Sequence, residues 1–266
     1  MRIPDPSPAS VYSYPRYYAI GYQWNTKAEC DFLDTCLSKR QGREAGAILD
    51  IGCGAGRHLL EMAQRGYRAT GFDLHPEMVA FVQEEAKKTG VAVSVSVGDL
   101  CRMTLVGTYD LAVCLMDTFR FLLMNDEILR HLREVGAHLS PQGVYVTDFW
   151  IPAKWDQIAN EIYQWEQTQG ETTVKVFYLQ HPESIDPIGQ TFEDELVFAV
   201  EEEGQQREIR GARTRTRLIL PQEFLALVEA SRVFDVVGVF SDFDATKPLA
   251  DGNLSWRMVS VLRKRS

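Results

Sequence analysis

The stretch Ile48-Leu-Asp-Ile-Gly-Cys-Gly-Ala-Gly-Arg-His58 decides the fold class, because it joins a buried strand, a glycine-rich turn and the start of a helix. Residues 47–51 are apolar apart from Asp50, which predicts a buried strand. The glycines Gly52, Gly54 and Gly56 then let the backbone turn tightly and approach a ligand without a Cβ in the way. Helical spacing resumes over residues 57–65, so the whole stretch is typical of a nucleotide-binding turn in an α/β protein.

The spacing of the glycines indicates which kind of nucleotide fits. A dinucleotide-binding turn needs its third glycine three positions after the second, and Arg57 occupies that position. A nucleoside ligand without a pyrophosphate is therefore favoured. Asp73 ends the next predicted strand, 67–73, where a carboxylate can accept two hydrogen bonds from a ribose diol, and Asp99 follows a third predicted strand, 92–97.

Five segments between residues 48 and 150 carry a family resemblance. They are LDIGCGAGRH, GFDLHPEM, VSVGDL, YDLAVCLMDTF and GVYVTDFW, in this order and at strand–helix spacing. In these segments the chain resembles the class I S-adenosylmethionine-dependent methyltransferases. The resemblance implies a Rossmann-like, doubly wound α/β fold whose seven-stranded sheet has six parallel strands and an antiparallel last one.

The resemblance also implies a set of cofactor contacts. Gly52 and Gly54 would line the amino-acid end of S-adenosylmethionine, Asp73 would hold the ribose, Asp99 would contact the adenine amine, and apolar side chains would sandwich the ring. Asp50 is interpreted as a core carboxylate bonded to the amides of the glycine turn. The remaining predicted cofactor-binding residues are Tyr22, which closes the site from the N-terminal segment, Cys53, Leu74, Met78, Leu100 and Leu115.

The pattern of the chain changes after Trp150. Up to that residue, strands alternate with amphipathic helices, including 25–40, 76–89 and one that Asn125 would cap. Beyond it, three strand-like runs without helices between them predict an inserted antiparallel sheet: 172–180, 190–201 and 208–220. We expect residues 1–160 and 221–266 to form the methyltransferase core, and residues 161–220 to form a β lid over the cofactor. This layout is similar to that of glycine and amino-sugar N-methyltransferases.

Composition narrows the class of substrate and the compartment. A formal net charge of −9 gives no electrostatic reason to bind a phosphate backbone, so nucleic-acid substrates are disfavoured. The five cysteines include no C-x-x-C pair, which speaks against a structural metal site or a disulfide framework and fits a reducing cytoplasm. No apolar run reaches the length of a membrane span. We expect a small-molecule acceptor; a homodimer is compatible with the sequence.

Methyl transfer from a sulfonium mainly requires orientation, so no catalytic triad is needed. Asp117 and Asp148 follow or end strands on the cofactor side and are the candidate general bases for an acceptor nitrogen or oxygen. Arg120, between Phe119 and Phe121, is a candidate to bind an anionic group of the acceptor; the alternative is an exposed arginine whose stem packs on the aromatic rings.

Other polar residues have structural interpretations. The five histidines, among them His58 and His131, are expected at surface or capping positions. The alternating Arg213, Arg215 and Arg217 face Glu193 and Glu195 in a predicted solvated row of cross-strand ion pairs. The aromatic residues after the fourth and fifth strands either pack in the core or wall an acceptor pocket: Phe119, Phe121, Phe149, Trp150 and Trp155.

Two other functions remain open from the sequence. A nicotinamide-dependent oxidoreductase shares the strand–turn–helix unit, although the glycine spacing and Asp99 speak against it. A protein that binds S-adenosylmethionine without turnover, as a sensor or partner subunit, is the other.

Overall fold

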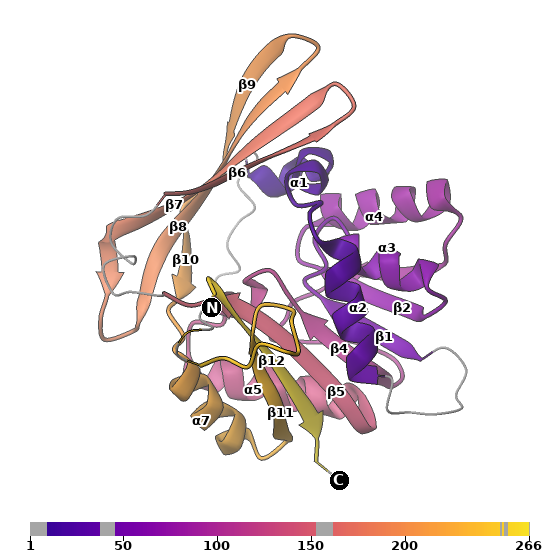
Figure 1. Cartoon of the computed structure of the whole chain (residues 1–266), viewed down its shortest axis with the longest axis vertical. Helices are drawn as coiled ribbons and strands as arrows, with labels where there is room; N and C mark the ends of the chain where they lie inside the picture. Colours follow the sequence, from indigo (N-terminus) through magenta and orange to yellow (C-terminus); the bar gives the residue numbers. More distant parts are fainter. Residues whose placement is uncertain (1–9, 38–45, 153–161, 251, 253–254, 266) are drawn as a thin grey trace.

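Two β-sheets organise the chain. The computed structural model describes residues 10–37, 46–152, 162–250, 252 and 255–265. Figure 1 shows a larger sheet flanked by helices, and a second, twisted sheet that projects from one end of it. Helix α1 (Pro15–Gly21) lies between the second sheet and the rest of the molecule. None of the described helices is long and apolar enough to cross a membrane.

The larger sheet has seven strands in the order β11-β12-β5-β4-β1-β2-β3. The strands are β1 (Ala47–Ile51), β2 (Arg68–Asp73), β3 (Val93–Val97), β4 (Tyr109–Cys114), β5 (Leu139–Trp150), β11 (Phe234–Ser241) and β12 (Arg257–Lys264). Strands β1 to β5 pair in parallel, and β12 pairs antiparallel with both β5 and β11. The predicted doubly wound sheet with one antiparallel strand, the last in the chain, is confirmed.

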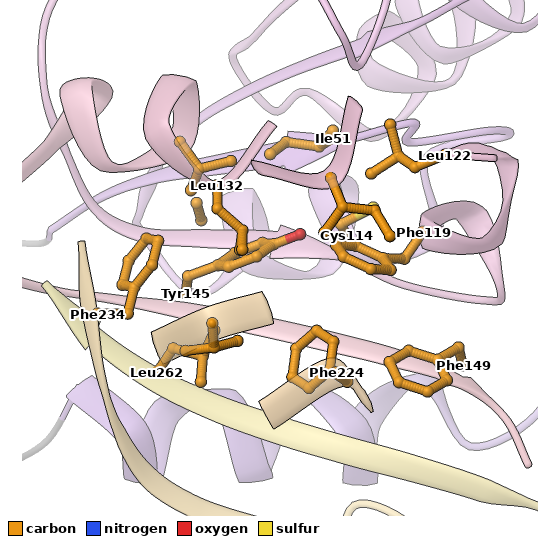
Figure 2. Close-up of a cluster of buried hydrophobic side chains, with 14 of the residues drawn as sticks. Ile51, Cys114, Phe119, Leu122, Leu132, Tyr145, Phe149, Phe224, Phe234 and Leu262 are labelled. Atoms are coloured by element: carbon orange, nitrogen blue, oxygen red, sulfur yellow. The ribbon is translucent and has the colours of Figure 1, made fainter. Parts of the chain in front are cut away.

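Helices cover both faces of this sheet, so β1, β4 and most of β5 are buried on both sides. One face carries α2 (Thr26–Leu37), α3 (Arg57–Gln64) and α4 (Pro76–Thr89). The other carries α5 (Asn125–His138) and α7 (Pro221–Ser231), whose apolar side chains pack with strand residues such as Tyr145 and Phe149 in the core cluster of Figure 2.

The second sheet consists of the strands that follow β5 in the chain. Its path is β10-β8-β7-β6, with β9 on β8, and every pairing is antiparallel. The strands are β6 (Ile162–Gln169), β7 (Thr172–Asp186), β8 (Thr191–Glu202), β9 (Gln205–Arg210) and β10 (Thr214–Arg217). An additional antiparallel sheet was predicted. Strand β6 was not, because its sequence is mostly polar, and none of its residues is buried.

The N-terminal segment is attached to the second sheet. Helix α1 follows a short 3₁₀ turn, η1 (Val11–Ser13). The Trp165 indole donates to the Gly21 carbonyl at 2.7 Å, and a Cβ on Gly21 would lie 2.8 Å from a methyl group of Val176. Glycine at position 21 therefore allows α1 to pack directly against β7. The sequence pattern predicted no helix here.

One expected boundary is wrong. Met124, not Asn125, is the N-cap of α5, and its amide is held at 3.1 Å by the Glu127 carboxylate. Asn125 is the first helical residue, and its side-chain oxygen accepts instead from the Arg217 guanidinium at 2.6 Å. A pairing between residues this distant in sequence was invisible to a local capping rule.

Candidate functional site

The glycine turn between β1 and α3 has the backbone that its sequence predicts. Gly52, Gly54 and Gly56 have φ of 69°, 53° and 79°, a region that favours glycine. A Cβ on Gly56 would lie 2.7 Å from Val82, so this glycine serves helix packing. A Cβ on Gly54 would meet only the Tyr18 ring, at 3.5 Å, which places Gly54 on the open side of the turn.

A cavity of about 560 Å³ adjoins this turn. Six of the predicted cofactor residues line it: Tyr22, Asp50, Gly52, Cys53, Gly54 and Leu115. Tyr18 also lines it and stacks on Tyr22 with ring centroids 4.3 Å apart. The sequence singled out one N-terminal tyrosine, whereas the structure places a stacked pair there.

The other predicted cofactor residues lie near the ends of β2 and β3. Asp73 accepts hydrogen bonds from the amides of Gly54, at 2.8 Å, and His75, at 2.9 Å. Leu74 is 41% exposed, whereas Met78 has no exposed surface. Met78 therefore cannot touch an adenine ring unless its neighbours move. Asp99 accepts from the Cys101 amide at 2.7 Å, and the neighbouring Leu100 packs against the core.

Asp50 is buried with one carboxylate oxygen unsatisfied. We expected a satisfied carboxylate bonded to the amides of the glycine turn, but Oδ2 has no hydrogen-bond partner among the described residues. Burial raises the pKa of Asp50 to about 7, the charge of Asp73 adds to the shift, and Arg57 opposes it. An unpaired acceptor on the wall of a cavity suits a ligand that brings its own hydrogen-bond donor.

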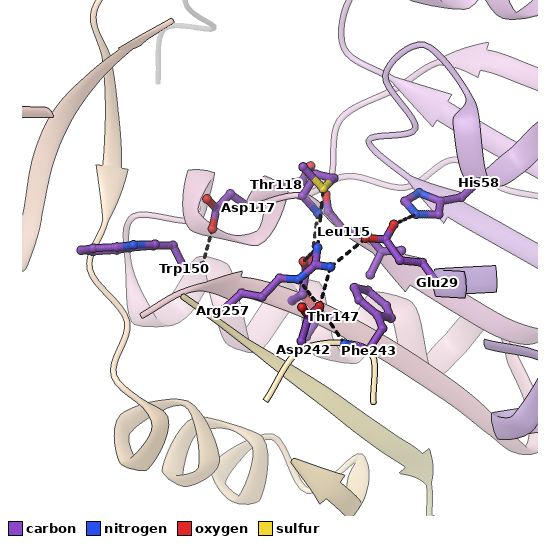
Figure 3. Close-up of polar contacts among 12 residues, drawn as sticks. Glu29, His58, Leu115, Asp117, Thr118, Thr147, Trp150, Asp242, Phe243 and Arg257 are labelled. Carbon is purple, nitrogen blue, oxygen red and sulfur yellow. Dashed lines mark hydrogen bonds and ion pairs between the residues drawn. The ribbon is translucent and has the colours of Figure 1, made fainter. Parts of the chain in front are cut away.

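A strained turn after β4 forms one wall of the site. Met116 and Asp117 both have positive φ, 59° and 64°, which is rare for residues other than glycine. Two carboxylates hold this turn: Asp148 accepts from the Met116 amide at 2.6 Å, and Asp117 accepts from the Trp150 amide, as Figure 3 shows for Asp117. Met116 lines the large cavity. The turn is thus pinned where β4 reaches the cavity.

Asp148 does not reach a substrate as a general base. It is 1% exposed, and its second oxygen accepts from Arg257 at 3.3 Å. Burial raises its pKa to about 7, and Arg257 opposes that shift. The expectation of a catalytic base at this position is corrected, because both oxygens are occupied within the protein. Asp117 keeps a side chain that is 27% exposed.

A buried ion-pair network lies beneath the site (Figure 3). Glu29 of α2 accepts hydrogen bonds from Arg57, His58 and Arg257 at 2.5, 2.7 and 2.7 Å. Despite burial, these donors lower the pKa of Glu29 to about 2, whereas burial lowers that of His58 to about 4. His58 was expected at the surface and is instead 5% exposed, because Glu29 covers it.

Arg120 is the clearest correction at the site. Its side chain is fully buried within η2 (Thr118–Phe121), contrary to both interpretations from the sequence. The guanidinium donates to the Arg217 carbonyl at 2.9 Å, to the Tyr178 hydroxyl at 3.2 Å, and to Thr216 and Asp194 at 2.8 and 3.3 Å. These partners occupy it, so it is not available to bind an anion of the acceptor.

Three further expectations need correction. His131 is fully buried between the Leu100 carbonyl and the Tyr145 hydroxyl, at 2.8 and 2.7 Å. Arg215 pairs with Glu193 at 3.1 Å as predicted, but Arg217 leaves the ion-pair row and is buried against Asn125 and Glu223. Of the aromatic residues, Phe119, Phe149 and Trp150 are buried, Phe121 is 37% exposed, and Trp155 lies outside the described residues.

The comparison with protein families agrees with the site. A family model described as a methyltransferase domain matches residues 48–143, from β1 through the glycine turn into β5. Residues 48–143 thus match a methyltransferase domain, in agreement with the resemblance of the chain to the class I S-adenosylmethionine-dependent methyltransferases. The family binds S-adenosylmethionine as its cofactor, and the matches favour neither a nicotinamide-dependent oxidoreductase nor a protein that only binds the cofactor.

Three relatives illustrate how far the similarity of this chain to known proteins extends. It is 26% identical over 210 residues to YqeM of Bacillus subtilis (strain 168), an inferred methyltransferase, covering 73% of this chain and 80% of that one. It is 30% identical over 112 residues to the dTDP-4-amino-2,3,4,6-tetradeoxy-D-glucose N,N-dimethyltransferase of Saccharopolyspora spinosa. The aligned region covers 42% of this chain and 43% of that one. The chain thus spans less than half of that relative. An S-adenosylmethionine-dependent methyltransferase of Clostridium acetobutylicum ATCC 824 shares the fold, with a TM-score of 0.76, 14% identity, and 95% and 98% of the two chains covered.

Proposed function

We propose that this protein transfers the methyl group of S-adenosylmethionine to a nitrogen or oxygen atom of a small molecule. The cavity at the glycine turn carries the proposal. It joins flexible glycine backbone, the unsatisfied Asp50 oxygen and the pinned Met116 turn in one space of about 560 Å³. That volume is in the range of cofactor sites.

The proposed cofactor contacts follow from these positions. Gly52, Cys53 and Gly54 would expose backbone to the methionine part, and Asp50 would accept from its amino group. Asp73 would bind the ribose hydroxyls after exchanging its bonds with the Gly54 and His75 amides. The remaining assignments are Leu74 and Asp99 at the adenine, Leu100 and Met78 behind it, Leu115 beside the sulfonium, and Tyr22 with Tyr18 as the cover.

S-adenosylmethionine, when bound, supplies a methyl group already activated by the sulfonium charge. The chain's own residues then orient the acceptor and exclude water. Asp117 is the proposed group that accepts a proton from the acceptor, since its side chain is partly exposed beside the site. Asp148 and Arg120 are proposed positioning residues: the first holds the Met116 amide, and the second holds the second sheet against η2.

The second sheet is proposed to cover the acceptor. We divide the chain into a core of residues 1–160 and 221–266 and a lid of residues 161–220. A covered pocket suits a small molecule better than a polymer, and the S. spinosa relative is named for an amino sugar linked to dTDP. An anionic acceptor is not proposed, because Arg120 is occupied. The acidic composition and the unpaired cysteines support a cytoplasmic location.

Calorimetry with S-adenosylmethionine and S-adenosylhomocysteine tests the cofactor site. Asp73→Ala should weaken binding by about 2–4 kcal/mol, because two charge-assisted hydrogen bonds to the ribose are lost. Asp126→Ala, at an exposed position of α5, is the matched control. Unchanged affinity in Asp73→Ala would remove the ribose assignment.

Turnover needs its own test. Cell extract incubated with the enzyme and labelled S-adenosylmethionine should yield a labelled small metabolite. Tight cofactor binding without label in any metabolite would instead support a protein that binds the cofactor without using it.

A further inference from the structure

A second, small cavity lies between the N-terminal segment, η2 and the second sheet. Its volume is about 40 Å³, and Tyr12, Phe121, Tyr178, Asp194 and Thr216 are among the residues that line it. A water molecule needs only about 10–15 Å³ by a comparable measure. The small cavity therefore has room for an amino group and the carbon that carries it, rather than for a whole metabolite.

Asp194 of β8 presents one satisfied and one unsatisfied oxygen. Its Oδ2 accepts from the Thr216 hydroxyl at 2.5 Å, from the Arg120 guanidinium at 3.3 Å and from the Tyr178 hydroxyl. Its Oδ1 has no hydrogen-bond partner within the part of the chain that the structure describes, although the residue is only 4% exposed. A buried carboxylate oxygen without a donor is unfavourable by about 1–3 kcal/mol or more, so a ligand that supplies a donor is stabilised there.

The charges around the small cavity favour a cation. The Arg120 guanidinium lies 3.3 Å from Asp194 and 3.6 Å from Asp117, so two carboxylates face one positive charge. Burial raises the pKa of the Tyr12 and Tyr178 hydroxyls, so both side chains stay neutral and do not change the local charge. Burial raises the pKa of Asp194 and the charge of Arg120 opposes that shift. When both carboxylates are ionised, the three groups carry a formal net charge of −1, which complements an ammonium group.

Tyr12 connects the small cavity with the cofactor end of the larger sheet. Its ring stacks on His75, with centroids 4.5 Å apart, and His75 lies two residues after Asp73, the proposed ribose ligand. Burial raises the pKa of Tyr12 most, and the charges of Asp73, Asp194 and Asp117 add to the shift, so Tyr12 lies within electrostatic reach of all three carboxylates. Tyr12 therefore links the small cavity to the end of the larger sheet where we propose that the cofactor binds.

We propose that Asp194 determines acceptor specificity, and that the acceptor is a small molecule with an amine that binds as an ammonium group and donates to Asp194 Oδ1 in the small cavity. Asp117, the proposed proton acceptor, takes one proton from this group before methyl transfer, so that the nitrogen has a free lone pair. This inference rests on the proposed methyl transfer and names its substrate class. Arg120, Tyr178 and Thr216 act as positioning residues, since they hold Oδ2 and leave Oδ1 without a partner among the described residues.

Binding of the methylammonium ion tests the proposal without knowledge of the natural acceptor. The full-length protein is saturated with S-adenosylhomocysteine, and saturation-transfer NMR follows methylammonium, with methanol and acetate as neutral and anionic probes. Methylammonium should bind at least tenfold more tightly than either probe. Asp194→Asn, which removes the charge and keeps the shape, should weaken its binding at least tenfold and leave S-adenosylhomocysteine affinity unchanged.

Glu195→Gln is the matched control, because the adjacent residue points to the opposite face of β8 and pairs with His181 and Arg210. Equal methylammonium signals in wild type and Asp194→Asn would overturn the proposal. So would a wild-type preference for methanol or acetate, or no probe binding at all, which would mean that the cavity holds only water. If Asp194→Asn does not fold, the three probes are compared on the wild-type protein alone. Tighter binding of methylammonium then supports the proposal, and its absence overturns it.

Label transfer separates this inference from the function on which it rests. The enzyme is offered acceptor pairs that differ only in an amine or a hydroxyl, such as glycine and glycolate, together with the metabolite labelled in cell extract. Label only in amines supports the role of Asp194. Label in a hydroxyl acceptor would leave methyl transfer standing and refute the inference; failure to bind S-adenosylmethionine would refute the function itself.

Discussion

Replacing Asp50 by asparagine should stabilise the cofactor-free protein at pH 8. The Asp50 side chain is 3% exposed, its Oδ2 lacks a partner among the described residues, and the nearby Asp73 charge repels it. Asparagine keeps the shape and removes the charge. The same change removes the negative charge and one of the two oxygens proposed to accept from the cofactor's amino group, so S-adenosylmethionine should bind about tenfold more weakly.

The size of the effect follows from the pKa of Asp50. Folding raises it from 3.8 to about 7, so the folded state holds its proton at pH values where the unfolded state has released it. The ionised carboxylate therefore opposes folding fully above pH 7, and the opposition fades as the pH falls through 7 toward 4. At 1.36 kcal/mol per pKa unit, about three units correspond to a ceiling of about 4 kcal/mol at pH 8, and about 2 kcal/mol at pH 5.

Thermal unfolding of the cofactor-free protein measures this difference. For a chain of this size, Asp50→Asn should raise Tm by on the order of 10 °C at pH 8, and by about half as much at pH 5. Asp126→Asn, with its side chain 73% exposed, should leave Tm within about 2 °C of wild type. An Asp50→Asn protein no more stable than wild type at pH 8, or a difference that does not shrink at pH 5, would refute the reasoning.

Three further predictions concern other parts of the site. Glu29→Gln should lower the free energy of unfolding by about 3–5 kcal/mol in urea titrations, because buried cations lose their shared carboxylate. Folding lowers the pKa of Glu29 to about 2, so this loss of stability should persist above pH 4.5 and fade toward pH 2. A loss below about 1 kcal/mol would contradict the stabilising role of the ion-pair network. Gly54→Val should abolish S-adenosylmethionine binding in calorimetry while circular dichroism shows a folded protein, since the branched side chain would lie on the open side of the turn. Retained affinity would show that the cofactor does not bind at Gly54. Arg120→Met should destabilise the protein by about 3–5 kcal/mol because Asp194 loses its buried partner. Normal stability combined with a raised acceptor KM would instead support the original interpretation that Arg120 binds the acceptor directly.

The parts of the structure that were predicted correctly are local in the chain. The glycine turn is encoded within nine residues, and the alternation of apolar strands and amphipathic helices up to Trp150 needs no knowledge of distant partners. Helix α4 runs from Pro76 to Thr89 as predicted, because proline at its first position and Gly90 after it mark both ends. These signals are sufficient for the doubly wound sheet.

The parts that were missed depend on contacts between distant residues. Glu29 and Arg257 are 228 positions apart, and Arg120 and Asp194 are 74 apart. No local sequence pattern can therefore show that these residues form buried ion pairs. The same holds for His58, which becomes a core residue only because Glu29 reaches it. Whether the sequence-predicted residues bind the cofactor as assigned remains a prediction.

The attachment of the N-terminal segment has a consequence for processivity. Helix α1 is fastened to the second sheet by the Arg16 and Tyr17 bonds to Glu202, at 2.6 and 2.8 Å, and by the Trp165 bond to Gly21. Tyr18 lines the large cavity and Tyr12 lines the small one, and both belong to this segment. If the second sheet moved away from the larger sheet, the segment would move with it, and both cavities would open together. Exchange of spent cofactor would then release the product as well, so an amine that receives two methyl groups would leave after the first and return for the second.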